Sequence, residues 1–334
     1  MQPSASGEGS TTVLKTPSSS SSPPAERVSL EVQRVPRRNL EVPFVALVFV
    51  VLLCVFYREV IFEGRTFLPF GSPAEVMGPA PPWGFSGVLR QNPYRLDAGG
   101  SAWQLEPWAR VVGTTYRGRG LPLWNPHQFF GIPFSADAQP GPFDVLRLPA
   151  ILTTRAWGWD AYYLIQAALS LAFTYGFART AGFRIEAALV AAIGYTFCGF
   201  MFIRGNMHYA EIYHVLPLLL WGTELLVQGR SRAGLVLVAI ATPVCVFAGF
   251  PEATALAFLY AGSFGVFRVI WAAATQKSWA LGVRRFALLA LGWIVGLGIA
   301  APQLIPLVEY MPISFNIHPP ERGLGLIALP LRAL

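Results

Sequence analysis

PFVALVFVVLLCVFYREVIF, residues 43–62, is an apolar run that marks this chain as a membrane protein. It has about the 20 residues that a helix needs to cross a hydrocarbon core roughly 30 Å thick. Its charged residues, Arg58 and Glu59, lie near its end. A secretory signal peptide would carry its apolar region much nearer the start of the chain, so this run is predicted to be an uncleaved transmembrane helix.

The segment before this helix, residues 1–42, is predicted to be a disordered cytoplasmic tail. It is rich in Ser, Pro and Thr, with the run PSSSSSPP at residues 17–24. Such a composition cannot bury enough apolar surface to order the chain. Arg34, Arg37 and Arg38 come directly before the helix. By the positive-inside rule, this cluster predicts that the N-terminus is cytoplasmic.

After a long polar and aromatic segment, residues 63–158, six further apolar spans make up residues 159–306. The expected spans are 159–179, 186–204, 209–228, 233–250, 252–273 and 284–306. Every second short connection is basic, carrying Arg179 and Arg184, then Arg230 and Arg232, then Arg268, Lys277, Arg284 and Arg285. The connections between these are poor in positive charge, so seven spans with a cytoplasmic N-terminus and an outer segment 307–334 are self-consistent.

The composition supports a membrane protein and excludes several soluble classes. Hydrophobic residues make up 54% of the chain and charged residues 13%. The net charge of +7 is scattered over short connections, so no nucleic-acid surface is expected. Cys54, Cys198 and Cys245 lie in apolar runs without CxxC spacing, which indicates neither a disulfide framework nor a zinc site. No Gly-rich phosphate loop, HExxH motif or serine nucleophile elbow is present.

The long segment 63–158 is predicted to face outward and to carry two helices in the membrane interface. Residues 102–112 place Trp, Leu and Val at helical spacing, which gives one apolar face. Residues 143–152 repeat the pattern with Val, Leu and Ile. Aromatic residues are dense throughout, as is typical at headgroup depth. The alternative is a loop that only rests on the bilayer.

Several motifs make the chain resemble a known family. They are RLD at residues 95–97, GLPLWNP at 120–126, FGIP at 130–133, ADAQ at 136–139 and APQLIP at 301–306. Together with the stretch from His208 to Glu224, they resemble the bacterial YfhO-type multi-pass membrane proteins. The WNP block with its following Gly-x-Pro is the most specific of these motifs, because any Leu-rich span resembles another.

The resemblance implies an all-α integral membrane fold of about seven helices and a glycosyltransferase of the GT-C type in a bacterial plasma membrane. Such enzymes take a sugar from a polyprenyl-phosphate donor and pass it to an extracytoplasmic acceptor, which can be an envelope polymer, a lipid or a protein. An acidic residue of the first outer loop takes part, and a divalent metal is one way to neutralise the phosphate. Membrane lipids are the other expected partners.

The chain departs from the family in two ways. His127 stands where an aromatic residue is common, and the sequence ends at Leu334, whereas relatives continue through further spans and an outer domain. We therefore expect either a missing C-terminal region or a second polypeptide that supplies it.

Two carboxylates of the outer segment are candidates for catalysis. Asp97 matches the family's acidic position, and its alternative role is to cap the helix that follows. Asp137 in the ADAQ motif is the second candidate, and it is also a natural turn residue. Trp124 and Asn125 are candidates for substrate binding, although the WNP block equally suits a role in fixing the loop's shape.

The other candidate substrate contacts lie at span ends on the outer side. His208 and Glu211 are three residues apart and share a helix face, which suits a metal, a phosphate-linked sugar or simple contact with headgroups. Glu252 follows Pro251 and suits helix capping as well as binding. Arg322 could contact a phosphate. His214 is predicted to be a core histidine.

Two other functions stay open. A transporter or flippase of lipid-linked saccharide would need ionisable residues or broken helices near the middle of the membrane. In this sequence most ionisable residues lie at span ends. A non-catalytic, truncated membrane scaffold is the other alternative, because the chain ends before its relatives do.

Overall fold

The computed structural model describes residues 38–67, 104–128, 130–153, 155–205 and 207–313, and the chain divides into two compact units, Met1–Val42 and Pro43–Leu334. Every contact reported below lies within the second unit. The elements in order are α1 (Arg38–Phe56), α2 (Arg58–Ile61), α5 (Glu106–Arg117), β1 (Trp124–Asn125), β2 (Ile132–Pro133), α6 (Leu148–Leu152), α7 (Ala156–Thr180), α8 (Ile185–Thr196), α9 (Gly199–Arg204), α10 (Tyr209–Val227), α11 (Ser231–Phe247), α12 (Pro251–Thr275), α13 (Trp279–Ile299), α14 (Ala301–Tyr310) and the 3₁₀ turn η2 (Met311–Ile313).

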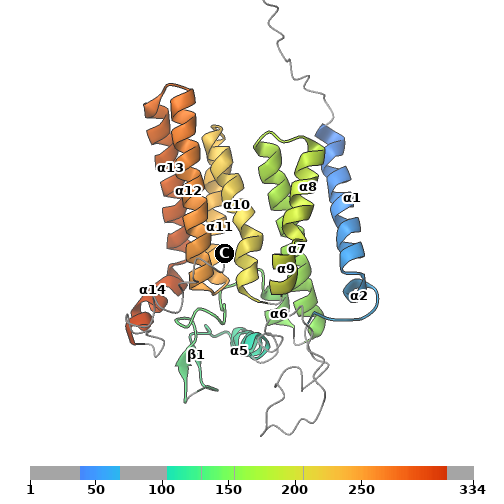
Figure 1. Ribbon diagram of the computed structural model, residues 1–334. Coiled ribbons are helices and arrows are strands. Elements are labelled where there is room, and N and C mark those ends of the chain that lie inside the picture. The colour runs from blue at the N-terminus through green and yellow to red at the C-terminus, as the bar shows by residue number, and fades with distance from the viewer. Residues whose placement is uncertain (1–37, 68–103, 129, 154, 206, 314–334) are drawn as a thin grey trace, which may run out of the picture. The chain divides into compact units, whose positions relative to one another are not determined.

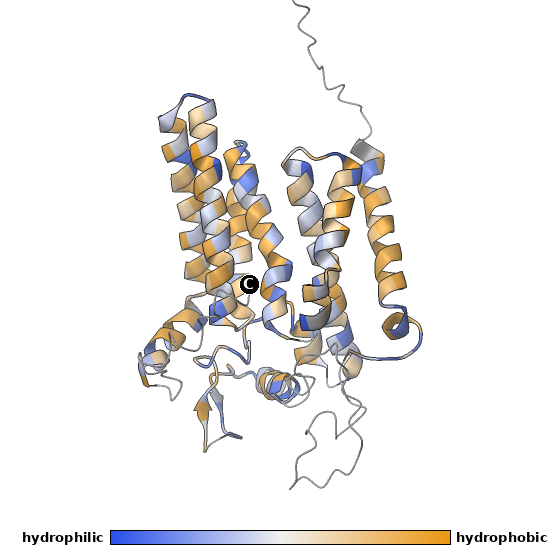
Figure 2. Ribbon diagram, in the orientation of Figure 1, coloured by the Kyte–Doolittle hydropathy of each residue, from blue (hydrophilic) through white to orange (hydrophobic). Residues whose placement is uncertain are grey.

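The described part of the chain is all-α apart from one small hairpin, and four helical stretches are long and apolar enough to cross a membrane. They are Ile185–Phe202, Tyr209–Val227, Pro251–Thr275 and Trp279–Ile299. Two shorter apolar helices are Leu40–Phe56 and Ser231–Phe247. Large apolar side chains stay exposed along α12 and α13. Figure 2 colours much of both helices orange, for hydrophobic residues. Surfaces of this kind suit lipid rather than water.

Helix α7, which is not one of these four, also carries buried polar residues. It is 25 residues long, and Gln166, Ser170 and Thr174 are buried on it. Ser170 accepts a hydrogen bond from the Thr196 hydroxyl of α8 at 3.0 Å. Polar contacts between helices are common where a span faces its neighbours rather than lipid.

Helix α10 lies at the centre of the helical core. Figure 1 shows it between α7 and α11, and it packs against α7, α11 and α12. Small residues allow the close approach to α11. A Cβ atom on Gly222 would lie 3.0 Å from the Val238 nitrogen, and one on Gly234 would lie 2.6 Å from the Gly222 oxygen. Small residues at such contacts are typical of helix packing in membranes.

The three basic connections lie at one end of the helices. Figure 1 shows the α7–α8, α10–α11 and α12–α13 turns at the end opposite α5, α6 and the hairpin. This arrangement is the one expected if all three turns face the cytoplasm and the loop faces outward.

The expected helix in residues 102–112 is found as α5, but its apolar face does not lie open to lipid. Trp108, Ala109 and Val112 are buried against Ile151 of α6 and Trp159 of α7. The expected second helix, residues 143–152, is reduced to α6, and a turn occupies residues 143–147. The loop therefore forms its own core with the start of α7, because packing on protein buries these aromatic side chains more completely than a bilayer surface would.

The hairpin is the one sheet in the described residues. Trp124 pairs with Pro133 and Asn125 pairs with Ile132 in antiparallel register. Gly131 has φ +116°, and a Cβ atom there would lie 2.4 Å from the Trp124 ring. The Gly-x-Pro of the FGIP motif is thus required by the turn, since only glycine fits beneath the indole.

Topology can be tested with introduced cysteines. In a background where Cys54, Cys198 and Cys245 are replaced by alanine, Ser231→Cys and Gly120→Cys should react with a membrane-impermeant maleimide from opposite sides. Ser231 begins α11 beside a basic turn, whereas Gly120 is exposed in the loop beyond α5. We expect Gly120→Cys to label in intact cells and Ser231→Cys only after lysis. Labelling of both from one side would refute the alternating arrangement.

Candidate functional site

A cluster of ionisable side chains is completely buried where the loop meets the helices. Asp144 and Arg147 come from the loop beside α6, Tyr162 from α7 and Glu211 from α10. None of the four has more than 1% of its surface exposed. Charged groups almost never occupy such positions unless they are paired, and inside a membrane protein they mark functional sites by default.

The turn before α6 creates the Asp144–Arg147 pair. Asp144 Oδ1 accepts hydrogen bonds from the backbone N–H groups of Leu146 at 2.9 Å and Arg147 at 3.2 Å. Its other oxygen, Oδ2, lies 3.1 Å from Arg147 Nε. One carboxylate therefore accepts from two N–H groups of the turn before α6 and pairs with the guanidinium of the third residue along.

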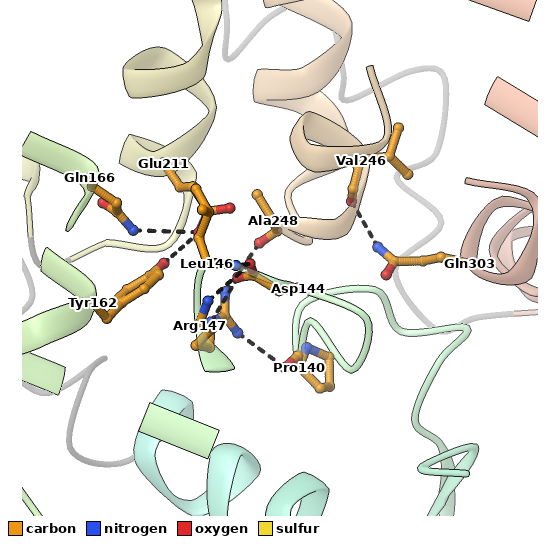
Figure 3. Close-up of polar contacts among 10 residues, drawn as sticks. All are labelled: Pro140, Asp144, Leu146, Arg147, Tyr162, Gln166, Glu211, Val246, Ala248 and Gln303. Atoms are coloured by element: carbon orange, nitrogen blue, oxygen red, sulfur yellow. Dashed lines mark hydrogen bonds and ion pairs between the residues drawn. The ribbon is translucent and has the colours of Figure 1, made fainter. Parts of the chain in front are cut away.

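Arg147 joins three separate parts of the chain. Its Nη1 donates to the Pro140 carbonyl at 3.0 Å and its Nη2 to the Ala248 carbonyl, just after α11, at 3.3 Å. The guanidinium also lies 5.8 Å from the centre of the Tyr162 ring. Gly141 leaves room for it, because its φ is +56° and a Cβ atom there would lie 2.8 Å from Nη1. Arg147 thus fastens the loop to α7 and to the end of α11 (Figure 3).

Glu211 completes the cluster from α10. Its Oε2 accepts from the Tyr162 hydroxyl at 2.7 Å and from Gln166 Nε2 at 3.4 Å, and Figure 3 shows both donors pointing toward it. Its other oxygen, Oε1, has no hydrogen-bond partner among the described residues. Burial raises the pKa of the Asp144 carboxyl, although the positive charge of Arg147 acts in the opposite direction. The cluster therefore brings two carboxyl groups and one guanidinium together in a fully buried position.

His208 lies beside this cluster at the start of α10. It is 7% exposed, packs edge-on against Phe250 at 5.2 Å, and its Nε2 has no hydrogen-bond partner among the described residues. Burial, helped by the charge of Arg147, lowers its pKa to about 3. The imidazole is therefore neutral at physiological pH. His214, one turn beyond Glu211, is buried as expected of a core histidine.

Asp137 lies in a turn after the hairpin and is half-buried. Its backbone N–H donates to the Pro133 carbonyl at 3.1 Å, and burial raises the pKa of its carboxyl group. The two residues that follow Asp137, Ala138 and Gln139, are held in place by contacts with other parts of the chain. Gln139 accepts from Gln104 at 3.0 Å, and a Cβ atom on Gly249 would lie 2.4 Å from the Ala138 carbonyl oxygen. Asp137 is thus a fixed, partly accessible carboxyl group.

Trp124 and Asn125 have different surroundings. Trp124 is 56% exposed, with its ring over Gly131. Asn125 is buried, accepts from the His127 N–H at 3.0 Å and donates to Gln128 at 2.8 Å. These contacts give Asn125 a part in shaping the turn, while Trp124 keeps an accessible face.

The remaining candidates lie apart from the cluster or outside the described residues. Glu252 is exposed in the first turn of α12, directly after Pro251, in the place that helix capping predicts. It makes none of the contacts of the buried cluster. Asp97 and Arg322 both lie outside the residues that the structure describes.

The sequence predicted a role for His208 and Glu211 but not for Asp144, Arg147 and Tyr162, which form the buried cluster with Glu211. A signal was present, since Asp144 and Arg147 are two charges within the apolar stretch 143–152. Asp160 was missed as well. It accepts from the Thr66 hydroxyl at 2.8 Å and the Phe67 N–H at 2.9 Å, which ties the beginning of the outer segment to α7.

No group of three or more His, Cys, Asp and Glu side chains in the described part of the chain has the geometry to hold a metal ion. Comparison of the chain with known protein families, with characterised proteins and with solved structures found no match.

Proposed function

We propose that this protein is a membrane glycosyltransferase that takes a sugar from a polyprenyl-phosphate donor at the outer surface. The proposal rests on the resemblance of the outer loop to YfhO-type proteins. The observation that supports it best is the buried Asp144–Arg147–Glu211–Tyr162 cluster, which fixes that loop on the helix ends. The proposal includes seven spans, with α1, α7 and α11 crossing the membrane as well, and a cytoplasmic N-terminus.

The proposed reaction has simple requirements. An acceptor hydroxyl oxygen attacks the anomeric carbon, the bond from that carbon to the phosphate oxygen breaks, and the polyprenyl phosphate leaves with the bonding electrons. A carboxylate takes the hydroxyl proton, and positive charge stabilises the departing phosphate. The membrane surface holds the lipid donor at a fixed depth, which supplies part of the positioning.

Asp137 is the described carboxyl group that best suits a proton acceptor. It is partly exposed, unlike Asp144 and Glu211, and burial raises its pKa toward the range in which a carboxylate is an effective base. Arg147 holds the Pro140 carbonyl three residues further along and so restrains the same turn. The sequence motif makes Asp97 the other candidate.

One observation favours a transporter as the second candidate function. Glu211 and His214 are buried within the first two turns of α10, and each has an atom without a partner among the described residues, Glu211 Oε1 and His214 Nδ1. Buried acidic and histidine side chains of this kind carry protons or substrates in many transporters. A transporter would move the lipid-linked sugar across the membrane without breaking the sugar–phosphate bond.

The test uses the full chain in liposomes that contain a radiolabelled polyprenyl-phosphate hexose, together with an envelope fraction as acceptor. We expect label to leave the organic-soluble lipid and to enter the acceptor only when the protein is present. Movement of intact donor between leaflets without transfer would support the transporter. Neither transfer nor movement, with every lipid-linked donor tried, would favour the scaffold and overturn the proposal.

A further inference from the structure

Arg285 is a buried cation on α13, at the end of the helices opposite the cluster. Its sequence position predicts an ordinary basic residue of a cytoplasmic turn. In the structure it is only 8% exposed, and its Nε and Nη1 atoms have no hydrogen-bond partner among the described residues. The adjacent Arg284 is exposed. Two buried donors of a charged group without acceptors are unfavourable, so this position suits an anion.

The packing of α13 places Arg285 beside the beginning of α11. A Cβ atom on Gly292 would lie 3.1 Å from Val238, and one on Gly296 would lie 2.5 Å from Thr242, so the two helices run side by side in the same direction. Arg285 is on the same buried face as Gly292, two turns nearer the start of α13. Two turns before the contact of Gly292 with Val238, the two helices reach Arg285 on α13 and the first turn of α11. Arg285 is therefore level with that first turn.

The first turn of α11 supplies further donors. Its N-cap residue, Arg230, makes no side-chain hydrogen bond to the helix, so the first N–H groups are free of a side-chain cap. Such N–H groups, at the positive end of a helix, bind phosphate readily. Arg230, Arg232, Lys277 and Arg284 are exposed at the same end and add positive charge.

The nearby carboxylate does not meet this need. Glu224, on α10, accepts from Arg268 Nε at 2.8 Å and from Arg268 Nη2 at 2.6 Å. It also accepts from Gln228 at 3.0 Å. Both of its oxygens are therefore occupied by other donors.

We propose that Arg285 and the first turn of α11 form a binding site for the phosphate group of an anionic phospholipid. The planar fork of a guanidinium matches two phosphate oxygens, and helix N–H groups can bind a third. Arg285 is the seventh residue of α13, about 10 Å along the helix from its start. A long arginine side chain can carry its guanidinium from there toward the headgroups. Basic sites between helices on the cytoplasmic side are known to take anionic headgroups.

The test compares thermal unfolding in nanodiscs of phosphatidylcholine with unfolding in nanodiscs that also contain phosphatidylglycerol. Bound lipid should raise the Tm of the unmodified protein by about 5 °C. Arg285→Met should lose this shift, and Arg284→Met, the exposed neighbour, should keep it. In phosphatidylcholine alone, Arg285→Met should be at least as stable as the unmodified protein, because it removes an unpaired charge.

A further arm distinguishes the source of the phosphate. Sodium phosphate added to phosphatidylcholine nanodiscs, against sodium chloride of equal ionic strength, should not reproduce the shift. Full reproduction would show a site for free phosphate and overturn the lipid assignment. If Arg285→Met does not fold, native mass spectrometry of Arg285→Lys should show less retained phosphatidylglycerol than Arg284→Lys. Equal Tm in both lipids, or a shift that survives Arg285→Met, would overturn the site itself.

Discussion

Arg147→Met should remove most of the folded protein from the membrane. The substitution keeps much of the side-chain volume but leaves the Asp144 carboxylate buried without its counter-charge and leaves the Pro140 and Ala248 carbonyls without their donor. Breaking a buried ion pair by removing one partner costs about 3–5 kcal/mol. Since whole domains are stable by only about 5–15 kcal/mol, a loss of this size is severe.

The measurement is the yield of monodisperse protein after extraction, with the Tm of whatever remains. Arg184→Met is the matched control, because Arg184 pairs with Glu186 at 3.5 Å on an exposed surface. Exposed pairs contribute about 0–1 kcal/mol, so this control should behave like the unmodified protein. Adding Asp144→Asn to Arg147→Met removes the unpaired charge and should restore part of the Tm. Normal yield of the Arg147→Met single variant would show that the cluster does not hold the loop in place.

The sequence predicted which parts of the chain are helical but not where every helix breaks. The expected span 209–228 agrees with α10, Tyr209–Val227. The expected span 186–204 is divided into α8 and α9, which separate at Cys198. The first helix ends at Phe56, before Arg58 and Glu59, which lie in the separate helix α2. Hydrophobicity is continuous through the break at Cys198, so composition alone does not locate it.

The last expected span, 284–306, shows the same difficulty. The structure places Trp279–Ile299 in α13 and begins α14 at Ala301, with Pro302 within the first two positions of that helix. Proline suits a helix start and disfavours a helix interior. The proline was visible in the sequence, but a single proline also occurs inside α10, at Pro217, where the helix continues.

The candidate site was predictable only in part because its contacts are long-range. His208 and Glu211 are three residues apart, and helical spacing alone puts them at one helix end. The bond from Arg147 to the Ala248 carbonyl joins residues 101 positions apart, and the bond from Tyr162 to Glu211 joins residues 49 apart. No local pattern specifies such partners. The burial of Arg285 was likewise not visible in the sequence, where it differs in no way from its exposed neighbour Arg284.

Asp97→Asn should lose nearly all sugar transfer while keeping normal expression. Asp97 lies outside the described residues, so this prediction comes from the motif that resembles the family's acidic position. Asparagine keeps the size of the side chain and much of its capping ability but cannot accept the proton. Loss of a general base lowers the rate by roughly 10² to 10⁴. Glu186→Gln, an exposed change away from the loop, is the control and should transfer at the normal rate.

Asp137→Asn decides between the two carboxylates. The pH dependence of the rate distinguishes a general base from a residue that only supports the structure of the loop. A base acts only when deprotonated, so the rate should rise as pH increases through its pKa. Burial places the pKa of Asp137 above its ordinary value, which would move that rise to higher pH. If Asp97 is the base, Asp137→Asn should reduce the rate without removing the rise. Asp137 would be identified as the base by two results together. They are near-normal transfer by Asp97→Asn and a residual rate in Asp137→Asn that does not depend on pH. Normal transfer by both variants would leave His208 and Glu211 as the pair to test, since neither of the two candidate loop carboxylates would then be needed.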